Sequence, residues 1–426
     1  MPRLAVIGAG WAGLAAAVAA TDAGHAISIF EASRALGGRA RTLPVNMPDG
    51  TTATLDNGQH IMIGAYRETL ALMHRVGVEP ADAFFAMPLT LRFPDGGGIA
   101  SPAWPAPLDA AAGILTARGW SWRDKASLLR TAMAWRRSKF ACGPRASVMD
   151  LCRGLTARVM AELIEPLCVS ALNTPASRSS GQVFLRVLGD ALFGKGYGVW
   201  NGSTLLLPRR DLGRLFPEAA AAWLTPRGGK VVVGHRVVAL APSGTGWQVD
   251  GQHFDAVILA CPSQEAGRLA QQSGIDAAGW AQQAGVPEHE AIATVYATSG
   301  QRLPLPMLAL RGAPDAPAQF VFDRGQLGGP HGLLAFVVSA SRGDRDTLQR
   351  QVIAQAHALG WLDVQPVQTV VEKRATFACT PGVQRPPIAI APGLLACGDY
   401  VEGPYPATLE GAVRSARQAV ALLSSH

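Results

Sequence analysis

The apolar positions at the start of the chain form two short runs on either side of a longer stretch. The runs cover residues 4–7 and 26–30, and a glycine-rich segment follows the first of them. Short apolar runs bounded in this way are typical of buried strands. A strand, a turn, a helix and a second strand in this order predict a βαβ unit.

The rest of the chain alternates between helical and strand-like patterns. Apolar residues at helical spacing predict a helix over 66–76, and a stretch rich in proline and glycine follows at 88–107. The next region, 108–187, has a mainly helical pattern. Strands are predicted over the remaining apolar runs, and a helix is predicted to close the chain. These runs are 231–240, 247–249, 256–261, 291–298, 333–339, 369–374 and 393–399.

The glycine-rich segment after the first strand has the spacing of a dinucleotide-binding turn. Its residues are Gly8, Ala9, Gly10, Trp11, Ala12 and Gly13. In such a turn the first glycine allows the tight bend, the second lets the backbone approach a pyrophosphate, and the third lets the helix pack closely. The pyrophosphate is expected at the helix N-terminus, where free N–H groups favour an anion.

Glu31 ends the second apolar run, where a dinucleotide-binding unit places an acidic residue. A carboxylate at this position accepts hydrogen bonds from ribose hydroxyls and repels a 2′-phosphate. The cofactor is therefore expected to carry an unphosphorylated ribose.

Two further segments resemble the signature of the flavin amine oxidase and phytoene desaturase superfamily. Glu31-Ala32 is followed by Gly37-Gly38-Arg39, and Gly398-Asp399 precedes the segment 405–412, Tyr-Pro-Ala-Thr-Leu-Glu-Gly-Ala. The resemblance implies FAD as the cofactor. No His or Cys stands directly before Thr408 in this segment, so FAD is expected to bind without covalent attachment.

The resemblance also assigns roles to single residues. It implies that Asp399, with Gly398, contacts the ribityl and phosphate end of the flavin, and that the last helix points its N-terminus at the pyrimidine edge. A helix dipole there would stabilise an anionic reduced flavin. The other residues implied in cofactor binding are Ala32, Gly38, Arg39, Gly58, Gln59, Thr408, Leu409 and, beside the adenine, Val237.

These observations predict an α/β fold with a Rossmann-type FAD-binding domain of the glutathione reductase kind. An α+β substrate domain is inserted into it, so both domains are discontinuous. The FAD-binding domain is predicted over 1–65, 206–286 and 386–426, and the substrate domain over 66–205 and 287–385.

The segment 55–66, Leu-Asp-Asn-Gly-Gln-His-Ile-Met-Ile-Gly-Ala-Tyr, narrows the resemblance. With the two terminal motifs it is similar to the squalene-associated flavoproteins called hydroxysqualene dehydroxylases, and the likeness covers nearly the whole chain. It implies FAD-dependent reductive removal of the hydroxyl of hydroxysqualene, which gives squalene for hopanoid synthesis. The long-chain isoprenoid substrate and the synthases that form hydroxysqualene are then the expected partners.

Two substitutions argue against an amine substrate. Amine oxidases of the superfamily carry an aromatic residue where this chain has Thr408, and many carry a lysine on the strand that corresponds to 291–297, which has none here. A site without these groups suits a neutral hydrocarbon.

His60 is the predicted general acid, because it follows Gly58-Gln59, which passes close to the flavin in the superfamily. An imidazolium donates a proton near neutral pH, and an allylic hydroxyl leaves poorly unless it is protonated. The alternative is that His60 only bonds to the backbone or to the flavin. Asp56 is interpreted as a structural partner of the loop, and Tyr405 as a residue that lines the cavity.

The bulk properties add three expectations. The net charge of +7 favours acidic surfaces, and without a nucleic-acid motif anionic lipid is preferred over nucleic acid. The segment 103–140 interleaves tryptophans with basic residues, which indicates either a peripheral membrane surface or a core-packed helix with a solvated basic face. The six cysteines lack metal-like spacing, so reduced thiols, no metal site and a cytoplasmic protein are expected. If the segment 103–140 is a membrane surface, the protein is expected at the inner face of the cytoplasmic membrane.

The electron donor is left open, since no second dinucleotide-binding motif is visible. A nicotinamide, NAD(P)H, or a docked partner would have to reduce the flavin. Two other functions also stay open. One is a carotenoid or phytoene-type FAD-dependent desaturase, and the other is a non-catalytic flavin-binding partner of isoprenoid synthases.

Overall fold

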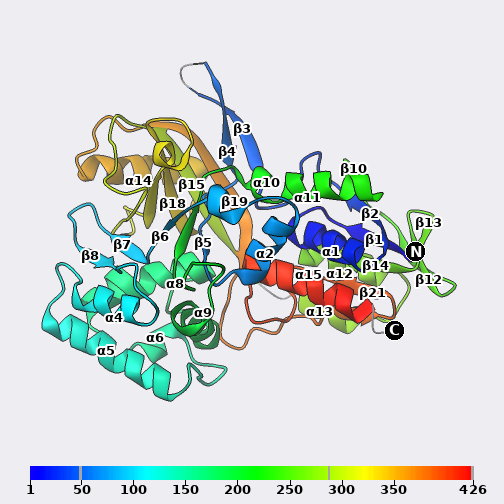
Figure 1. The fold of residues 1–426 in the computed structure, drawn as a ribbon, viewed down its shortest axis with the longest axis horizontal. Coiled ribbons are helices and arrows are strands. Elements are labelled where there is room, and N and C mark those ends of the chain that lie inside the picture. The colour runs from blue at the N-terminus through cyan, green and yellow to red at the C-terminus, as the bar shows by residue number, and fades with distance from the viewer. Residues whose placement is uncertain (48–49, 286–287, 424–426) are drawn as a thin grey trace.

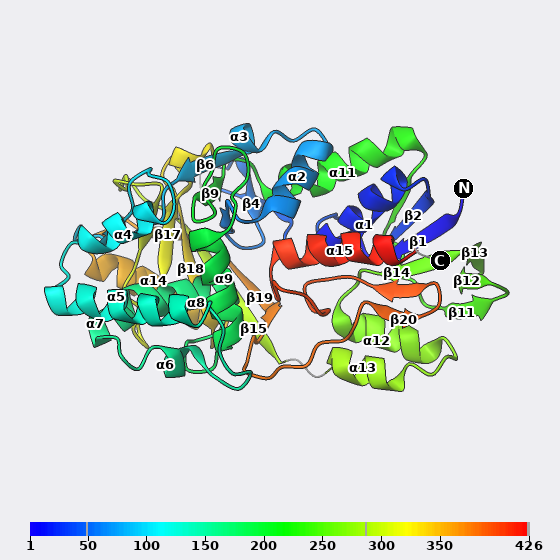
Figure 2. The ribbon, with the colours of Figure 1, turned by 60° about the horizontal axis from the view of Figure 1, so that its bottom comes forward.

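Two β-sheets, each covered by helices, organise the chain (Figures 1 and 2). The computed structural model describes residues 1–47, 50–285 and 288–423. The predicted domain boundary between residues 286 and 287 therefore lies outside the described residues.

The first sheet has six strands in the order β10-β2-β1-β14-β21-β20. The first five strands are parallel, and β20 is antiparallel to β21. This order places β1 at the centre with the helix α1, Trp11–Asp22, behind it, which confirms the predicted βαβ unit. The strands are β1 Arg3–Ile7, β2 Ala26–Glu31, β10 Lys230–Val233, β14 Ala256–Leu259, β20 Ala389–Ala391 and β21 Leu394–Ala396.

The closing helix, α15 at Leu409–Leu423, lies against α1 on the same face of this sheet (Figure 2). Small residues make this close packing possible, since α1 presents mostly alanines to its neighbours. The helix α2, Arg67–Arg75, joins the same apolar cluster through Leu70 and Met73, which are fully buried. In its packing α2 thus belongs with the first sheet, although the predicted division placed it in the substrate domain.

The second sheet has five antiparallel strands in the order β16-β17-β18-β15-β19. Alternate residues of β15 point to opposite faces, as in any strand. Val295 packs toward α14, Arg345–Ala358, and Tyr296 packs into the larger cluster on the other face. The strands are β15 His289–Thr298, β16 Met307–Ala309, β17 Phe320–Asp323, β18 Leu333–Ser341 and β19 Gln365–Phe377.

The region from residue 108 to 193, which lies in sequence between β2 and β10 of the first sheet, is mainly helical, as predicted for 108–187. Ser121 and Asp124 form a capping box at the start of α5, and Asn173 ends α8 in a left-handed conformation. The helices are α4 Leu108–Leu115, α5 Trp122–Arg137, α6 Val148–Leu151, α7 Ala157–Val159, α8 Glu165–Leu172 and α9 Gly181–Phe193, with a π-helical turn at Met160–Ile164.

Shorter elements connect these layers. The hairpin of β3 and β4 projects from the body of the molecule (Figure 1). The short strands are β3 Thr42–Asn46, β4 Thr52–Asp56, β5 Met62–Ile63, β6 Phe84–Met87, β7 Thr90–Arg92, β8 Gly98–Ala100, β9 Leu205–Pro208, β11 Leu240–Ser243, β12 Gly246–Val249 and β13 Gln252–Phe254. The remaining α-helices are α3 Pro80–Ala83, α10 Leu212–Leu215, α11 Pro217–Leu224, α12 Ser263–Gln272 and α13 Ala278–Gly285.

The strand predicted over 231–240 is interrupted. β10 ends at Val233, and β11 begins only at Leu240. Between them the N–H groups of Val238 and Ala239 donate to the carboxylate of Asp250, at 3.0 and 2.8 Å, instead of to a neighbouring strand. The N–H groups of Gly234 and His235, directly after β10, still donate to the carbonyls of Ser33 and Glu31, both at 2.8 Å. Only residues 238 and 239 bond to a side chain from a later turn, and the local pattern does not show this bond.

The six cysteines form no disulfide, and five of them are buried. Cys261 and Cys397 are small core residues. Within the described residues, no helix is long and apolar enough to cross a membrane.

The carboxylate of Glu410 joins α15 to α2. It is fully buried and accepts from the N–H and hydroxyl of Thr69 at 2.9 and 2.8 Å, from the N–H of Glu68 at 3.2 Å, and from Arg414 at 2.7 Å. The free N–H groups at the start of α2 are thus satisfied by a residue from the other end of the chain.

We expect Glu410→Ala to destabilise the fold by about 3–5 kcal/mol, since it leaves buried donors and Arg414 without their acceptor. The free energy of urea unfolding of the flavin-free protein measures this. Glu410→Gln keeps one acceptor oxygen and serves as the matched control with a smaller loss. Equal stability of the Ala variant and the parent would contradict this role of Glu410.

Candidate functional site

The turn between β1 and α1 has the geometry that a dinucleotide requires. Gly8 has a φ of 113°, and a Cβ on Gly13 would lie 1.9 Å from the carbonyl oxygen of Gly8. A Cβ on Gly10, in contrast, would meet no atom closer than the Cα of Gly38 at 3.8 Å. Gly13 is therefore required by the protein itself, whereas Gly10 borders space that a ligand can use. Ala9, Trp11 and Ala12 are buried around this turn.

Glu31 holds this turn through its side chain. Its carboxylate accepts from the N–H of Ala9 and from the N–H of Ser33, both at 2.7 Å. Each carboxylate oxygen can accept more than one hydrogen bond, so capacity for a ribose hydroxyl is left. Glu31 thus has a structural role that the sequence did not indicate, beside its predicted role toward ribose.

Arg39 brings the two ends of the chain together. Its guanidinium pairs with Asp399 at 2.6 Å and donates to the carbonyl of Ala375, on β19, at 2.8 Å. Gly37 donates to the carbonyl of Ala9 at 2.9 Å, so the Gly-Gly-Arg segment lies directly beside the glycine-rich turn. The carboxylate of Asp399 raises the pKa of Arg39, which stays charged. Ala32 is exposed at the end of β2, close to this segment.

The Gly-Asp pair after β21 is anchored by the closing helix. Gly398 donates to the hydroxyl of Ser415 at 2.9 Å, and this hydroxyl donates back to the carbonyl of Gly398. The next residue, Tyr400, is buried, and its hydroxyl has no hydrogen-bond partner within the described residues. Buried hydroxyls are nearly always satisfied, so this group at the carboxyl edge of the sheet fits a site for a polar ligand. Tyr400 was not among the predicted site residues, although it directly follows Gly398-Asp399.

The segment after β4 forms the opposite wall. Gly58 has a φ of 113°, and the N–H of Gln59 donates to the hydroxyl of Thr294, on β15, at 3.4 Å. The amide oxygen of Gln59 accepts from Arg324 at 3.1 Å. Asn57 donates to Glu372 and to the carbonyl of Arg39, both at 3.0 Å. The predicted residues Gly58 and Gln59 are therefore held between the second sheet and the Arg39 segment.

His60 is bonded to the backbone. Its Nδ1 lies 2.8 Å from the carbonyl oxygen of Gly58, so Nδ1 carries the hydrogen and donates it. Burial, opposed by this hydrogen bond, lowers the pKa of His60 below its ordinary value. The ring is thus neutral at neutral pH, and a neutral ring of this tautomer offers only an acceptor at Nε2. The expected imidazolium is not the resting form.

Asp56 is a structural partner of the loop, as interpreted from the sequence. Its carboxylate accepts from the N–H of Leu212, at the start of α10, at 2.8 Å. Burial raises the pKa of Asp56 to about 6. The hydroxyl of Tyr296 donates to the carbonyl of Asp56 at 2.9 Å.

The N-terminus of α15 completes the site. The hydroxyl of Thr408 accepts from the N–H of Gly411 at 3.0 Å and donates to the carbonyl of Tyr405 at 2.9 Å. Leu409 is the first residue of the helix. The hydroxyl of Tyr405 donates to Asp190, on α9, so it is directed at the helical region. Thr408 thus caps the helix.

Val237 lies in the loop between β10 and β11. It is buried, and the N–H of His235, two residues before it, donates to the carbonyl of Glu31 at 2.8 Å. Val237 is therefore close to the end of β2, on the side of Glu31. The structure thus gathers Gly10, Glu31, Arg39 and Asp399 along the carboxyl ends of the parallel strands, where open α/β sheets bind ligands.

The comparisons with known proteins agree with this arrangement. A family model described as flavin containing amine oxidoreductase matches residues 11–424. The hydroxysqualene dehydroxylase of Rhodopseudomonas palustris is 28% identical over 98% of this chain and 97% of that protein. That of Zymomonas mobilis is 26% identical over 99% of each chain. A zeta-carotene desaturase of Synechocystis is 36% identical but covers only 18% of this chain.

Solved structures show the same fold. An oxidoreductase from Methanosarcina mazei superposes with a TM-score of 0.72 at 15% identity, over 98% of this chain and 99% of that chain. Reduced UDP-galactopyranose mutase superposes with a TM-score of 0.70 at 14% identity, over 100% of this chain and 94% of that chain. These neighbours confirm the predicted α/β fold with its Rossmann-type sheet.

Substitutions of Gly10 and Gly13 in this turn distinguish an effect on cofactor binding from an effect on folding. We expect Gly10→Val to lose most of its bound flavin while it keeps the parent's circular dichroism, because the protein leaves room there. Gly13→Ala is expected to misfold, since its Cβ would collide with the Gly8 carbonyl. Flavin absorbance of the purified proteins measures this. A Gly10→Val protein with the parent's flavin content would contradict the assignment.

Proposed function

Because the chain belongs to the family of flavin-containing amine oxidoreductases, we propose that it binds FAD without covalent attachment and reductively removes the hydroxyl of hydroxysqualene to give squalene. The observation that carries this proposal is the similarity to hydroxysqualene dehydroxylases along nearly the full length of both chains. Zeta-carotene desaturases match a much shorter part, which favours the dehydroxylase over the desaturase.

The site residues fit FAD. The space beside Gly10 suits a pyrophosphate at the start of α1, and Glu31 suits an unphosphorylated ribose. The unpartnered hydroxyl of Tyr400 supplies a polar group at the same edge. The N-terminus of α15, capped by Thr408, would place the positive end of its dipole at the flavin ring.

The surroundings of the flavin support a neutral substrate. The hydroxyl of Thr408 takes part in the helix cap, and its side chain has no aromatic ring that could bind a cation. The strand β15 carries Thr294 beside Gln59 and contains no lysine. Neither feature of the amine oxidases that recognises or oxidises an amine is therefore present at these positions.

The reaction replaces a C–OH bond with a C–H bond. The hydroxyl takes up one proton and leaves as water, and a hydride forms the new C–H bond at the same carbon. FAD, when bound and reduced, would supply that hydride, with a nicotinamide or a partner protein as the source of electrons. The protein has to deliver the proton at the hydroxyl oxygen and keep other water away from the cationic carbon. We propose His60 for the proton delivery and the buried segment 56–59 for the exclusion of water.

Anaerobic turnover tests the function. We expect FAD-loaded protein with dithionite to convert hydroxysqualene into squalene, as detected by lipid chromatography. The same protein with squalene or phytoene and an electron acceptor should give no desaturated product. The Gly10→Val protein provides the flavin-free control. Formation of a polyene, or no product in either direction, would contradict the proposal and would favour the desaturase or the non-catalytic partner.

The pH dependence of turnover tests His60. A donor with a lowered pKa in the free protein is protonated only at acidic pH, so kcat/KM, which reports on the free enzyme, should fall as the pH rises through a value below 6.5. We expect His60→Gln to lose this limb and to lose about 100-fold or more in kcat, in the range of general acid catalysis. If the His60→Gln variant still showed this fall with rising pH, His60 would not be the proton donor and would only hold the Gly58 loop in place. Flavin content, measured alongside, reports on the loop.

A further inference from the structure

The helix α5 carries an apolar ridge on its solvent side. Trp122, Ala126, Leu129 and Met133 follow the spacing that places residues on one face of a helix. Trp122 is 74% exposed and Met133 is 51% exposed. Large apolar side chains this open to solvent are not part of the core, although they lie on a helix whose opposite face is buried.

Basic side chains border this α5 ridge on both sides. Arg123, Arg130 and Arg137 recur every seven residues and form one row, and Lys125 and Arg136 lie on the other side. Within the part of the chain that the structure describes, no carboxylate pairs with these five residues. The acidic residue of the helix, Asp124, is buried on the opposite face, where it bonds to Ser121 and Thr156.

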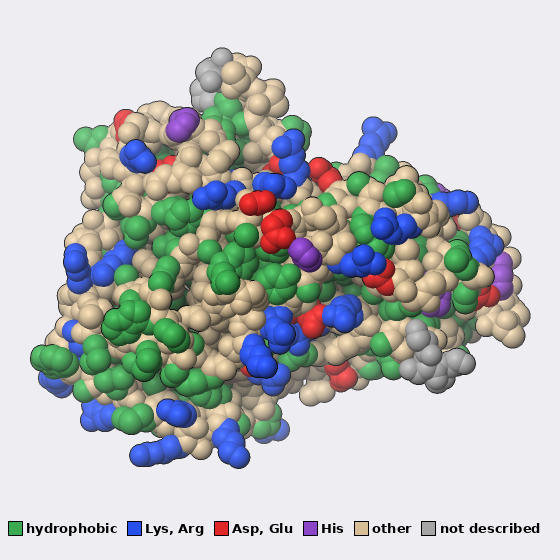
Figure 3. Space-filling view, viewed as in Figure 1, with side chains coloured by type: hydrophobic (Ala, Val, Ile, Leu, Met, Phe, Trp, Pro, Cys, Tyr) green, Lys and Arg blue, Asp and Glu red, His purple; other side chains and the backbone are tan. Residues whose placement is uncertain are grey.

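The end of α4 extends the ridge. Lys125 donates to the carbonyl of Leu115 at 2.7 Å, so the C-terminus of α4 lies beside the start of α5. Leu115, Leu108 and Trp104 are about half exposed, at 48%, 60% and 55%. Figure 3 shows apolar side chains gathered over the region of α4 and α5, with basic side chains along its lower margin.

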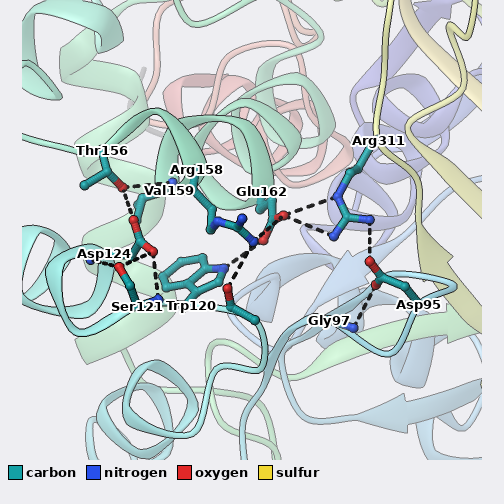
Figure 4. A network of polar contacts seen from close by, with 11 residues as sticks. Asp95, Gly97, Trp120, Ser121, Asp124, Thr156, Arg158, Val159, Glu162 and Arg311 are labelled. Atoms are coloured by element: carbon teal, nitrogen blue, oxygen red, sulfur yellow. Dashed lines mark hydrogen bonds and ion pairs between the residues drawn. The ribbon is translucent and has the colours of Figure 1, made fainter.

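The surface is rigid because the inner face of α5 is anchored. Trp120, directly before the helix, donates to the buried carboxylate of Glu162 at 2.8 Å, and Arg311 pairs with the same carboxylate at 3.1 Å (Figure 4). Trp135 packs against Phe184. Two tryptophans of the segment 103–140 are thus core residues, and the two others, Trp104 and Trp122, are exposed, with the ammonium of Lys125 5.1 Å from the ring centre of Trp122.

We propose that the α5 ridge and the end of α4 lie on the surface of an anionic lipid bilayer. The apolar strip would insert where the lipid headgroups meet the acyl chains, and the long basic side chains on both sides of it would reach the lipid phosphates. A tryptophan is suited to that interface. A groove of about 520 Å3 between α5 and 154–156 is lined by Trp122, Arg123 and Arg130, which gives a headgroup phosphate a place next to the ridge.

Vesicle sedimentation tests the charges. We expect the protein to bind vesicles of phosphatidylcholine with phosphatidylglycerol more tightly than vesicles of phosphatidylcholine alone, and less tightly as salt rises. The variant with Arg123, Arg130 and Arg137 changed to Ser should bind the anionic vesicles on the order of a hundred-fold more weakly.

A matched control removes three exposed arginines elsewhere. Arg342, Arg345 and Arg350, on and before α14, changed to Ser give the same change in net charge and should leave binding near the parent's level. Equal losses in the two triple variants, or no binding of the parent protein to anionic vesicles, would overturn the proposal. Unchanged flavin content in both variants shows that they are folded.

The ridge itself is tested by Trp122→Ser with Met133→Ser. These exposed residues are not needed for folding, so the variant should keep its circular dichroism and lose roughly ten-fold in binding to anionic vesicles, since binding scales with the apolar area inserted. Full binding of this variant to the anionic vesicles would overturn the role of the apolar ridge, since the basic side chains alone would then account for binding.

Discussion

The ion pair between Arg39 and Asp399 is the contact on which the site depends. The two residues are separated by most of the chain, and their side chains meet at 2.6 Å where the parallel strands end. Arg39 also donates to β19 through the carbonyl of Ala375, so one guanidinium joins the end of the first sheet, through Asp399 after β21, to the second sheet. A planar guanidinium has several donors in a fixed geometry, which suits it to hold two partners at once. Asp399 is buried, and without this partner its charge would be uncompensated.

The closing helix α15 is likewise held in place by several side-chain contacts. Thr408 caps it, Ser415 ties it to Gly398, and Glu410 ties it to α2. Each contact is made by a residue close to the N-terminus of α15 or on its buried side, so the position of this terminus is determined from several directions. A helix dipole acts only over the first turn. Its effect on a bound ring therefore requires that the terminus cannot shift, and these contacts provide that constraint.

Much of the fold could be predicted because its signals are local. The turn from Gly8 to Gly13, the two strands around it and the closing helix each depend on residues that are neighbours in sequence. The break in the strand predicted over 231–240 could not be predicted, since the N–H groups of Val238 and Ala239 bond to the distant carboxylate of Asp250 instead of to a neighbouring strand. The position of α2 against the first sheet depends in the same way on Glu410. Such contacts between distant segments leave no periodic pattern.

The candidate site was predicted less completely than the fold, for a related reason. Glu31 and Arg39 were predicted as cofactor-binding residues, but their bonds to Ala9 and Ala375 appear only in three dimensions. Tyr400 directly follows the predicted pair Gly398-Asp399 but was not predicted as a site residue. The sequence cannot show that its hydroxyl is buried without a hydrogen-bond partner among the described residues. The tryptophans of 103–140 divide between core and surface, since helical spacing gives the faces of α5 but not which of them meets the protein.

The state of His60 decides how such a site can handle a proton. A ring that is neutral at rest, with Nδ1 bound to Gly58, can hold a proton only at Nε2. Taking up that proton in a buried place is costly, so the charge is best tolerated when an acceptor on the substrate is already in contact with it. Protonation and departure of the hydroxyl would then be coupled events. This coupling would protect the reactive carbon. The proton becomes available only when the substrate hydroxyl is bound, so the carbon becomes cationic only after the substrate has displaced other water from the site.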